Sequence, residues 1–438
     1  MQSGDAVTLA DDDGSPGWLL LTRVAFRFCV VCFGLFCLLF VQILVVFTGV
    51  LGAVLPPNAA VWQMSALAPV TEWVGRHVFG VDAALRPGSS SGDQTAMWVF
   101  MFNLLVVAIM ATVLWSVLDR RRTHYQRLHA WFVVFLRVCL GGQMLYYGAD
   151  KVIPVQMPAP PLTALLRPYG QLSPTWVLWL QVGSSYPYEI ALGVVELVAG
   201  VLLFWPRTAT LGALLALASM AQVFLLNMTF DVSVKILSFQ LLLLALVLLA
   251  PHAKRLANVL VSERSSPPVT QSALFTTGRA IKAATAGLGA WVLAGSMLLS
   301  GLDWYDDGGG RPKPELYGIW TVEEFTRDGA SLPPLTTQRN RWQRLIVNEP
   351  DRLSYQLMDG VLVKRAAVFN AHSITVADAP VPATLTADRP APDQLRLSGQ
   401  LHGHPVTMTL RRLDLNSFPL RRNGFHWVQE YPDNPLEE

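Results

Sequence analysis

Charged residues are scarce in this sequence: Asp, Glu, Lys and Arg together make up 15% of its 438 residues, while 52% of the residues are hydrophobic. Soluble domains usually carry about 25% charged residues. The deficit is confined to the part before residue 302, because the remainder has the composition of an ordinary soluble domain. A net charge of +2 without a basic and aromatic stripe gives no indication of a nucleic-acid partner. We therefore expect a membrane protein with a water-soluble C-terminal part.

Cysteine and catalytic motifs are scarce as well. All four cysteines lie in apolar runs, so the C-terminal part is expected to have no disulfide. Cys29 and Cys32 form a C-x-x-C pair, which in an apolar helix we interpret as small buried hydrophobic residues. His402 and His404 supply two metal ligands without a third, which favours a hairpin turn and predicts no metal site. No phosphate loop, nucleophile elbow or H-E-x-x-H motif indicates a nucleotide enzyme or a hydrolase, and no catalytic residue is assigned.

The N-terminus lacks the features of a cleavable signal peptide. It is acidic, with Asp11, Asp12 and Asp13, and the apolar run that follows is too long. We expect residues 1–23 to be a cytoplasmic tail and the run that begins at Val24 to be a retained first span.

Seven apolar runs reach the ~20 residues that a helix needs to cross a bilayer. They are Val24–Leu55, Ala96–Leu118, Leu128–Gly148, Pro187–Trp205, Leu211–Met228, Val234–Leu249 and Ala283–Leu302. Lys and Arg gather in the loops after the second, fourth and sixth runs, as in Arg120–Arg122. Because such loops remain in the cytoplasm, this bias predicts a multi-pass protein of the cell membrane with a cytoplasmic N-terminus and an extracytoplasmic C-terminus.

The runs divide the chain into six further parts. These are 24–127 for two transmembrane helices with an outer loop, 128–260 for a four-helix core, 261–282 for a cytoplasmic loop, 283–302 for the seventh helix, 303–316 for a linker and 317–438 for a β domain. Of the long outer loops, one contains the amphipathic segment Val61–Phe79 and the other, 149–186, is rich in Pro, Tyr and Trp. We expect both loops to lie on the outer membrane surface, in a position to roof a cavity.

Beyond residue 316, short runs of β-forming residues alternate with turn residues. The eight runs are Gly318–Thr326, Trp342–Val347, Arg352–Met358, Val361–Phe369, Ser373–Ala377, Ala383–Ala387, Gln394–Gln400 and Pro405–Leu413. This spacing predicts a small antiparallel barrel or a sandwich, and Gly318-Ile319-Trp320 resembles the start of lipocalin-like barrels. The expected fold is an all-α polytopic membrane bundle of about seven helices, followed by a small all-β barrel-like domain.

Ionisable side chains inside apolar runs are costly in a bilayer and indicate function by default. Arg137 lies near the middle of the third run and Glu196 near the middle of the fourth, with Glu189 on the same helical face as Glu196. Glycines on both faces permit close approach, so we expect an ion pair between Arg137 and Glu196. Two interpretations stay open: a structural pair that fixes helix register, or a ligand or proton site.

Further polar residues gather near the outer surface, including Lys151 at the end of the third run. Asp231 and Lys235 alone, at helical spacing, fit an interfacial salt bridge. Taken together, the polar residues are expected to line an outward-facing cavity. The predicted ligand-binding residues are Arg137, Lys151, Glu189, Glu196, Gln222, Asn227, Asp231 and Lys235.

Short motifs follow one another in a distinctive order between residues 128 and 260. They are Arg137, Tyr147-Gly148-x-x-Lys151, Tyr169-Gly170-x-x-Ser173-Pro174, Glu196-x-x-x-Gly200, Arg207-Thr208 and Asn227-x-x-x-Asp231-Val232-x-Val234-Lys235. In this order they resemble DoxX-like integral membrane proteins, of a larger subgroup with a C-terminal lipocalin-like β domain. The resemblance implies a DoxX-like core at 128–260, similar in fold to vitamin K-dependent carboxylase-like membrane proteins. It also implies an association with respiratory quinone reduction and with thiol or oxidative-stress complexes.

From these features we expect a redox-associated membrane protein that holds a quinone or a similar apolar ligand within its helical core, oriented by Lys151, Glu196 and Arg137. The expected partners are the lipid bilayer and an envelope or redox protein bound through the C-terminal domain. The alternative is a non-enzymatic membrane scaffold, or a lipid- or protein-binding envelope protein, in which the charges only fix packing. No inverted repeat indicates a transporter.

Overall fold

The structure, a computed structural model, describes residues 17–56, 62–262, 279–377, 382–422 and 424–430. The chain forms two compact units. The membrane unit comprises Met1–Gln156 and Pro187–Trp304, and the barrel unit comprises Met157–Tyr186 and Tyr305–Glu438. The segment 157–186, which we expected within the 128–260 core, therefore belongs to the barrel unit.

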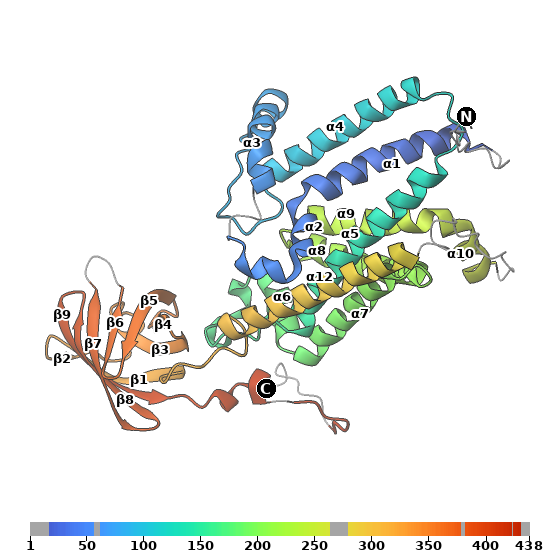
Figure 1. The fold of residues 1–438 in the computed structure, drawn as a ribbon. Coiled ribbons are helices and arrows are strands. Elements are labelled where there is room, and N and C mark those ends of the chain that lie inside the picture. Colours follow the sequence, from blue (N-terminus) through green and yellow to red (C-terminus); the bar gives the residue numbers. More distant parts are fainter. Residues whose placement is uncertain (1–16, 57–61, 263–278, 378–381, 423, 431–438) are drawn as a thin grey trace, which may run out of the picture. The chain divides into compact units, whose positions relative to one another are not determined.

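Seven helices among the described residues are long and apolar enough to cross a membrane, as predicted. They are α1 (Leu20–Leu39), α4 (Thr95–Leu118), α5 (Gln126–Val152), α7 (Tyr186–Phe204), α8 (Ala209–Thr229), α9 (Lys235–Leu249) and α12 (Arg279–Asp306) (Figure 1). Helix α9 continues through η6 (Ala250–His252) and α10 (Ala253–Leu260). Between α1 and α4, the helix α3 (Trp62–Val74) and the π turn η3 (Gly75–Phe79) occupy the segment predicted to be amphipathic. The chain is a multi-pass membrane protein.

The first apolar run does not form one span to Leu55, so that boundary was wrong. Helix α1 ends at Leu39, Phe40 takes an extended conformation, and the short α2 (Val41–Val45) and 3₁₀ helix η1 (Val46–Val54) follow. Within η1, Gly49 has a φ of 56°, and a Cβ there would collide with the indole of Trp291 on α12. The indole nitrogen of Trp291 donates to the carbonyl of Phe47 at 3.1 Å. The bend at Gly49 is therefore held by contact with α12.

Glycines let α5 and α7 pack closely, as the sequence predicted. A Cβ on Gly148 of α5 would lie 2.8 Å from the backbone nitrogen of Leu197, and one on Gly193 of α7 would lie 2.7 Å from the Cβ of Lys151. Two helical turns before Gly148 on α5, Gly141 faces Leu203 of α7. These contacts fix an antiparallel register in which the end of α5 lies beside the first half of α7.

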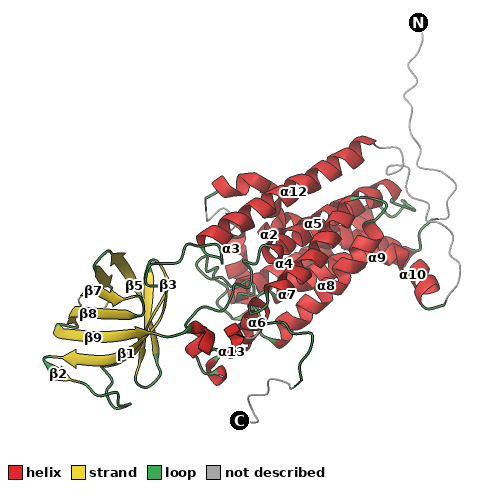
Figure 2. Cartoon of the chain, turned by 90° about the horizontal axis from the view of Figure 1, so that it is seen from below, coloured by secondary structure: helices red, strands yellow, loops and turns green. Residues whose placement is uncertain are grey.

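The C-terminal domain is a closed barrel of eight antiparallel strands, which decides between the two predicted architectures (Figure 2). The strands are β1 (Gly318–Arg327), β3 (Trp342–Glu349), β4 (Arg352–Leu357), β5 (Leu362–Asn370), β6 (Ser373–Val376), β7 (Ala383–Ala391), β8 (Gln394–Leu401) and β9 (His404–Arg412). Pairing of β1 with β9 closes the barrel, and the two-residue β2 (Ala330–Ser331) pairs antiparallel with the end of β1. His402 and Gly403, with φ of 52° and 79°, form the β8–β9 hairpin, which confirms the turn interpretation of this pair of histidines.

The barrel interior is filled by side chains and not by a large ligand space. Trp320, Phe325 and Trp342 are at most 2% exposed, and Trp342 stacks on Tyr355 with ring centroids 4.4 Å apart. Barrels of eight strands have an interior that side chains can fill. The domain is therefore a barrel with a packed interior.

One end of the barrel is covered by the segment that links α5 to α7. Leu162 is fully buried against Ile319 and Ile346, and its backbone nitrogen donates to the Oδ1 of Asn348 at 3.3 Å. The segment follows α5, while the barrel follows α12, four spanning helices later. Since four crossings return the chain to the side from which it started, this contact agrees with the seven-span topology.

Candidate functional site

Two buried charges of the membrane unit form an ion pair between α5 and α7. The Nζ of Lys151 lies 2.6 Å from the Oε2 of Glu196, and the two side chains are 7% and 2% exposed. The Oγ of Ser219, on α8, donates to the other carboxylate oxygen at 3.2 Å. The close approach at Gly148 and Gly193 brings the two charges together. Because a buried charge without a partner is strongly destabilising, each member holds the other in place.

Arg137 does not pair with Glu196, so the predicted ion pair was wrong. Its guanidinium donates from Nε and Nη2 to the carbonyl oxygen of Leu203, at 3.0 and 2.7 Å. The helix register explains the difference, since Leu203 lies seven residues, roughly 10 Å, beyond Glu196 along α7. Helix α7 ends at Phe204, so the Leu203 carbonyl has no intrahelical partner. Arg137 therefore caps the C-terminus of α7, where a positive charge is favourable.

Two other residues extend the buried polar face around Lys151. The ring of Tyr147 lies 5.8 Å from the Nζ of Lys151, a cation–π distance, and packs edge-on against Tyr146. Glu189 is fully buried in the first turn of α7, where the helix dipole favours a carboxylate. Of the predicted residues, the structure therefore brings Lys151 and Glu196 into contact and places Glu189 two turns before Glu196 on the same helix.

A second polar group lies where α5 meets α12. Ser300 donates to the Oδ1 of Asp150 at 2.7 Å, and both Ser300 and Ser296 are buried. Beside them is a cavity of about 210 Å³, open on one side. Its wall is formed by Val45, Val46, Thr48, Gly49, Gly52, Leu55, Pro56, Tyr146, Ser296 and Leu299. Sequence reasoning missed this site, although the spacing of Ser296 and Ser300 places both hydroxyls on one face of an apolar helix.

Three further predicted residues, Asn227, Asp231 and Lys235, form a polar cluster at the junction of α8 and α9. Lys235 contacts Asp231 at 2.9 Å, which confirms the predicted salt bridge. Asn227 donates to the Oγ of Ser238 at 3.0 Å. Asp93 accepts the backbone N–H groups of Lys235 and Ile236 at 2.8 and 3.0 Å and thus caps α9 from a distant loop. This cluster has the features of a structural cap.

Gln222 is exposed on the surface of α8, so the structure does not bring it into the buried site. The cysteines are all free thiols, and Cys32 packs in the apolar core, in line with the hydrophobic interpretation. No group of three or more His, Cys, Asp or Glu side chains within the described residues could hold a metal ion.

A buried arginine that the sequence analysis did not identify holds α1 against the α4–α5 loop. Arg27, 1% exposed, donates to the hydroxyl of Tyr125 at 2.7 and 2.9 Å and to the Oγ of Ser116 at 3.0 Å. The same hydroxyl donates to the Oδ2 of Asp119 at 2.7 Å. Burial, and then the hydrogen bond to Asp119, raises the pKa of Tyr125. This network joins the start of α1 to the end of α4.

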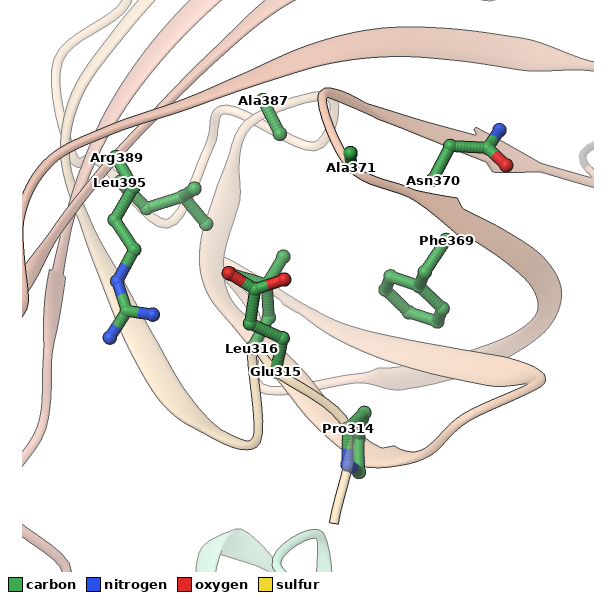
Figure 3. Close-up of a pocket in the computed structure, with 9 residues that line it drawn as sticks. All are labelled: Pro314, Glu315, Leu316, Phe369, Asn370, Ala371, Ala387, Arg389 and Leu395. Atoms are coloured by element: carbon green, nitrogen blue, oxygen red, sulfur yellow. The ribbon is translucent and has the colours of Figure 1, made fainter. Parts of the chain in front are cut away.

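The barrel unit contains a small cavity near one end of the barrel, lined by Glu315, Leu316, Phe369, Arg389 and five neighbours (Figure 3). Its volume is about 70 Å³. Since a water molecule occupies about 30 Å³ of liquid, this space suits one or two waters and not an organic ligand. The larger cavity of the membrane unit is therefore the better candidate for a ligand.

Comparison with known proteins gives a relative of unassigned activity. No family model and no solved structure matches the chain. The uncharacterized protein YwoB of Bacillus subtilis (strain 168) is 34% identical over 136 residues, a match that covers 29% of this chain and 80% of YwoB. A match at this identity over most of the relative's length shows common family membership. The chain belongs to the family of the uncharacterized protein YwoB.

Proposed function

We propose that this protein is an integral protein of the cell membrane that holds a small apolar ligand, a quinone or a molecule like it, within its helical unit. The observation that carries the proposal is a ring-sized cavity close to the buried Lys151–Glu196 pair. The motifs that resemble DoxX-like proteins support a quinone over other apolar rings. The barrel then lies outside the cytoplasm, available to a redox or envelope partner, as the distribution of basic loops predicts.

The cavity has the size and lining that a quinone ring requires. An apolar cavity of about 150 Å³ can hold a benzene molecule, and the cavity here is about 210 Å³. Its walls are mostly apolar, while Tyr146, Thr48 and Ser296 contribute hydroxyl groups. A quinone carbonyl needs a hydrogen-bond donor in an otherwise apolar site. Tyr146, in the wall, has a phenol that can serve as this donor.

The rings of Tyr146 and Tyr147 connect the cavity to the Lys151–Glu196 ion pair. Tyr146 lines the cavity and packs against Tyr147 with ring centroids 5.2 Å apart, and Tyr147 in turn faces Lys151. The ammonium end of the pair faces the ring of Tyr147, so the dipole of the pair favours electron density on a bound ring, and surroundings of low dielectric constant strengthen this effect. Lys151 and Glu196 therefore act on the ligand through the tyrosines and not by direct contact.

One observation favours the alternative of a non-enzymatic scaffold. Arg137, Lys151 and Glu196 each have a partner within the protein, so the charged face is already satisfied without a ligand. In a scaffold the same contacts would serve only to fix the packing of α5 on α7.

The ligand-binding protein and the scaffold are distinguished by the binding of a short-chain benzoquinone to the full chain. This binding is measured in lipid nanodiscs by equilibrium dialysis. Ser296→Leu fills the cavity and is expected to reduce affinity at least tenfold, and Lys151→Met with Glu196→Leu is expected to reduce it less. The matched control is Asp82→Asn with Arg86→Met, which removes an exposed ion pair and leaves affinity unchanged. Equal affinity in all four proteins, or no saturable binding to any of them, would contradict the proposal and favour the scaffold.

A further inference from the structure

The chain beyond the barrel exposes apolar side chains in an unusual concentration. It leaves β9 through η7 (Leu415–Ser417) and the short helix α13 (Pro419–Arg422). Four large apolar residues then follow within nine positions: Leu420, Phe425, Trp427 and Val428 are 59%, 75%, 92% and 74% exposed. Single exposed apolar residues are normal on a soluble domain, whereas a cluster marks a contact surface.

This segment begins at the end of the barrel that contacts the chain following the spanning helix α5. Leu415 and Phe418 pack around Leu162, in the same cluster as Ile319 and Ile346. Leu162 follows Val152, the last residue of α5, by ten residues, so the connecting chain reaches at most about 35 Å. The exposed residues follow Phe418 by two to ten positions. The tether therefore keeps them within reach of the bilayer surface.

We propose that residues 420–422 and 424–428 form an interfacial membrane anchor that inserts into the lipid headgroup region of the leaflet on the barrel's side. Trp is enriched at this depth, and Trp, Phe and Leu form the apolar face of segments that lie in the interface. The rings of Phe425 and Trp427 pack edge-on, with centroids 4.9 Å apart, and so present one apolar wedge. Arg421, exposed just before the wedge, suits the phosphate groups of the lipids.

The lipid surface is a better occupant than the barrel itself. Among the described residues after Asp414, Leu415 and Phe418 pack at the end of the barrel. Beyond Phe418, residues 424–430 are all exposed. An anchor here gives the barrel a third attachment to the membrane, after the linker from α12 and the segment 157–186. The barrel is thereby kept at the membrane surface.

A fluorescent label at position 427 tests the anchor in the full chain. Trp427→Cys is made in a Cys29→Ala background, labelled with bimane and reconstituted into vesicles of phosphatidylcholine and phosphatidylglycerol. Quenching by nitroxide-bearing lipid is compared with quenching by aqueous iodide. The matched control is Val368→Cys, a site on the barrel wall that is 62% exposed. Substitution at sites this exposed is not expected to unfold the domain.

The expected result is several-fold stronger nitroxide quenching at 427 than at 368, with the reverse order for iodide. Equal quenching at the two sites by both agents places the segment in water and overturns the proposal. Protection of the label at 427 from both quenchers also overturns it, because the segment is then buried against protein.

Discussion

Loss of Lys151 alone is expected to destabilise the membrane unit strongly, whereas loss of both members of its ion pair is not. In Lys151→Met the carboxylate of Glu196, 2% exposed, loses a cation that lay 2.6 Å away. Removal of one partner from a buried pair costs about 3–5 kcal/mol. Replacement of both partners by apolar residues of similar volume is often neutral or stabilising by about 1–4 kcal/mol. Lys151→Met with Glu196→Leu should therefore recover the stability that Lys151→Met loses.

The free energy of unfolding in lipid bicelles, measured by steric trapping at neutral pH, provides the comparison. Arg86→Met is the matched control, because Arg86 and its partner Asp82 are 75% and 71% exposed and such pairs contribute about 0.2–1 kcal/mol. If Lys151→Met costs no more than Arg86→Met, the pair is in contact with water and the buried site is wrong. If the double variant is as unstable as the single one, a further buried charge must depend on Glu196.

Three other changes test separate parts of the fold. Gly49→Ala places a methyl group against Trp291 at a positive φ, so it should cost about 1–3 kcal/mol and lower the thermal unfolding temperature. Asp93→Ala removes the cap of α9 and should cost about 1 kcal/mol, whereas Asp93→Asn should retain most of the stability. The raised pKa of Tyr125 means that the folded state favours the neutral phenol, so stability is full below about pH 10 and falls as the pH rises through the folded pKa. Tyr125→Phe should remove that part of the alkaline sensitivity, measured by unfolding between neutral and alkaline pH.

The barrel was predictable because its determinants are local. Each strand shows as a short run of β-forming residues, and the turns carry residues suited to positive φ, as at Asp328-Gly329 and His402-Gly403. The spanning helices were predictable for a similar reason, since length and apolar composition decide whether a helix can cross a bilayer. In both cases the signal lies within a single segment.

The predictions that were wrong concern features that contacts between distant segments determine. The run from Val24 to Leu55 is apolar throughout, so nothing in its own pattern reveals a bend at Gly49 that is held by contact with Trp291 of α12. Arg137 and Glu196 do lie on facing helices, but the glycine spacing permits more than one register between these helices. In the observed register, Glu196 forms its ion pair with Lys151. The same limit applies to Asp93, whose role as a cap involves a helix more than a hundred residues away.

The central claim is that the membrane unit retains a ring-bearing apolar ligand. A mass-spectrometric survey of all lipids and quinones that remain bound to the purified full chain tests it most directly. We expect a quinone in near-equal molar amount to the protein, and a smaller amount of bound quinone in the Ser296→Leu variant. Bulk phospholipid alone, with the same profile in both proteins, would contradict it.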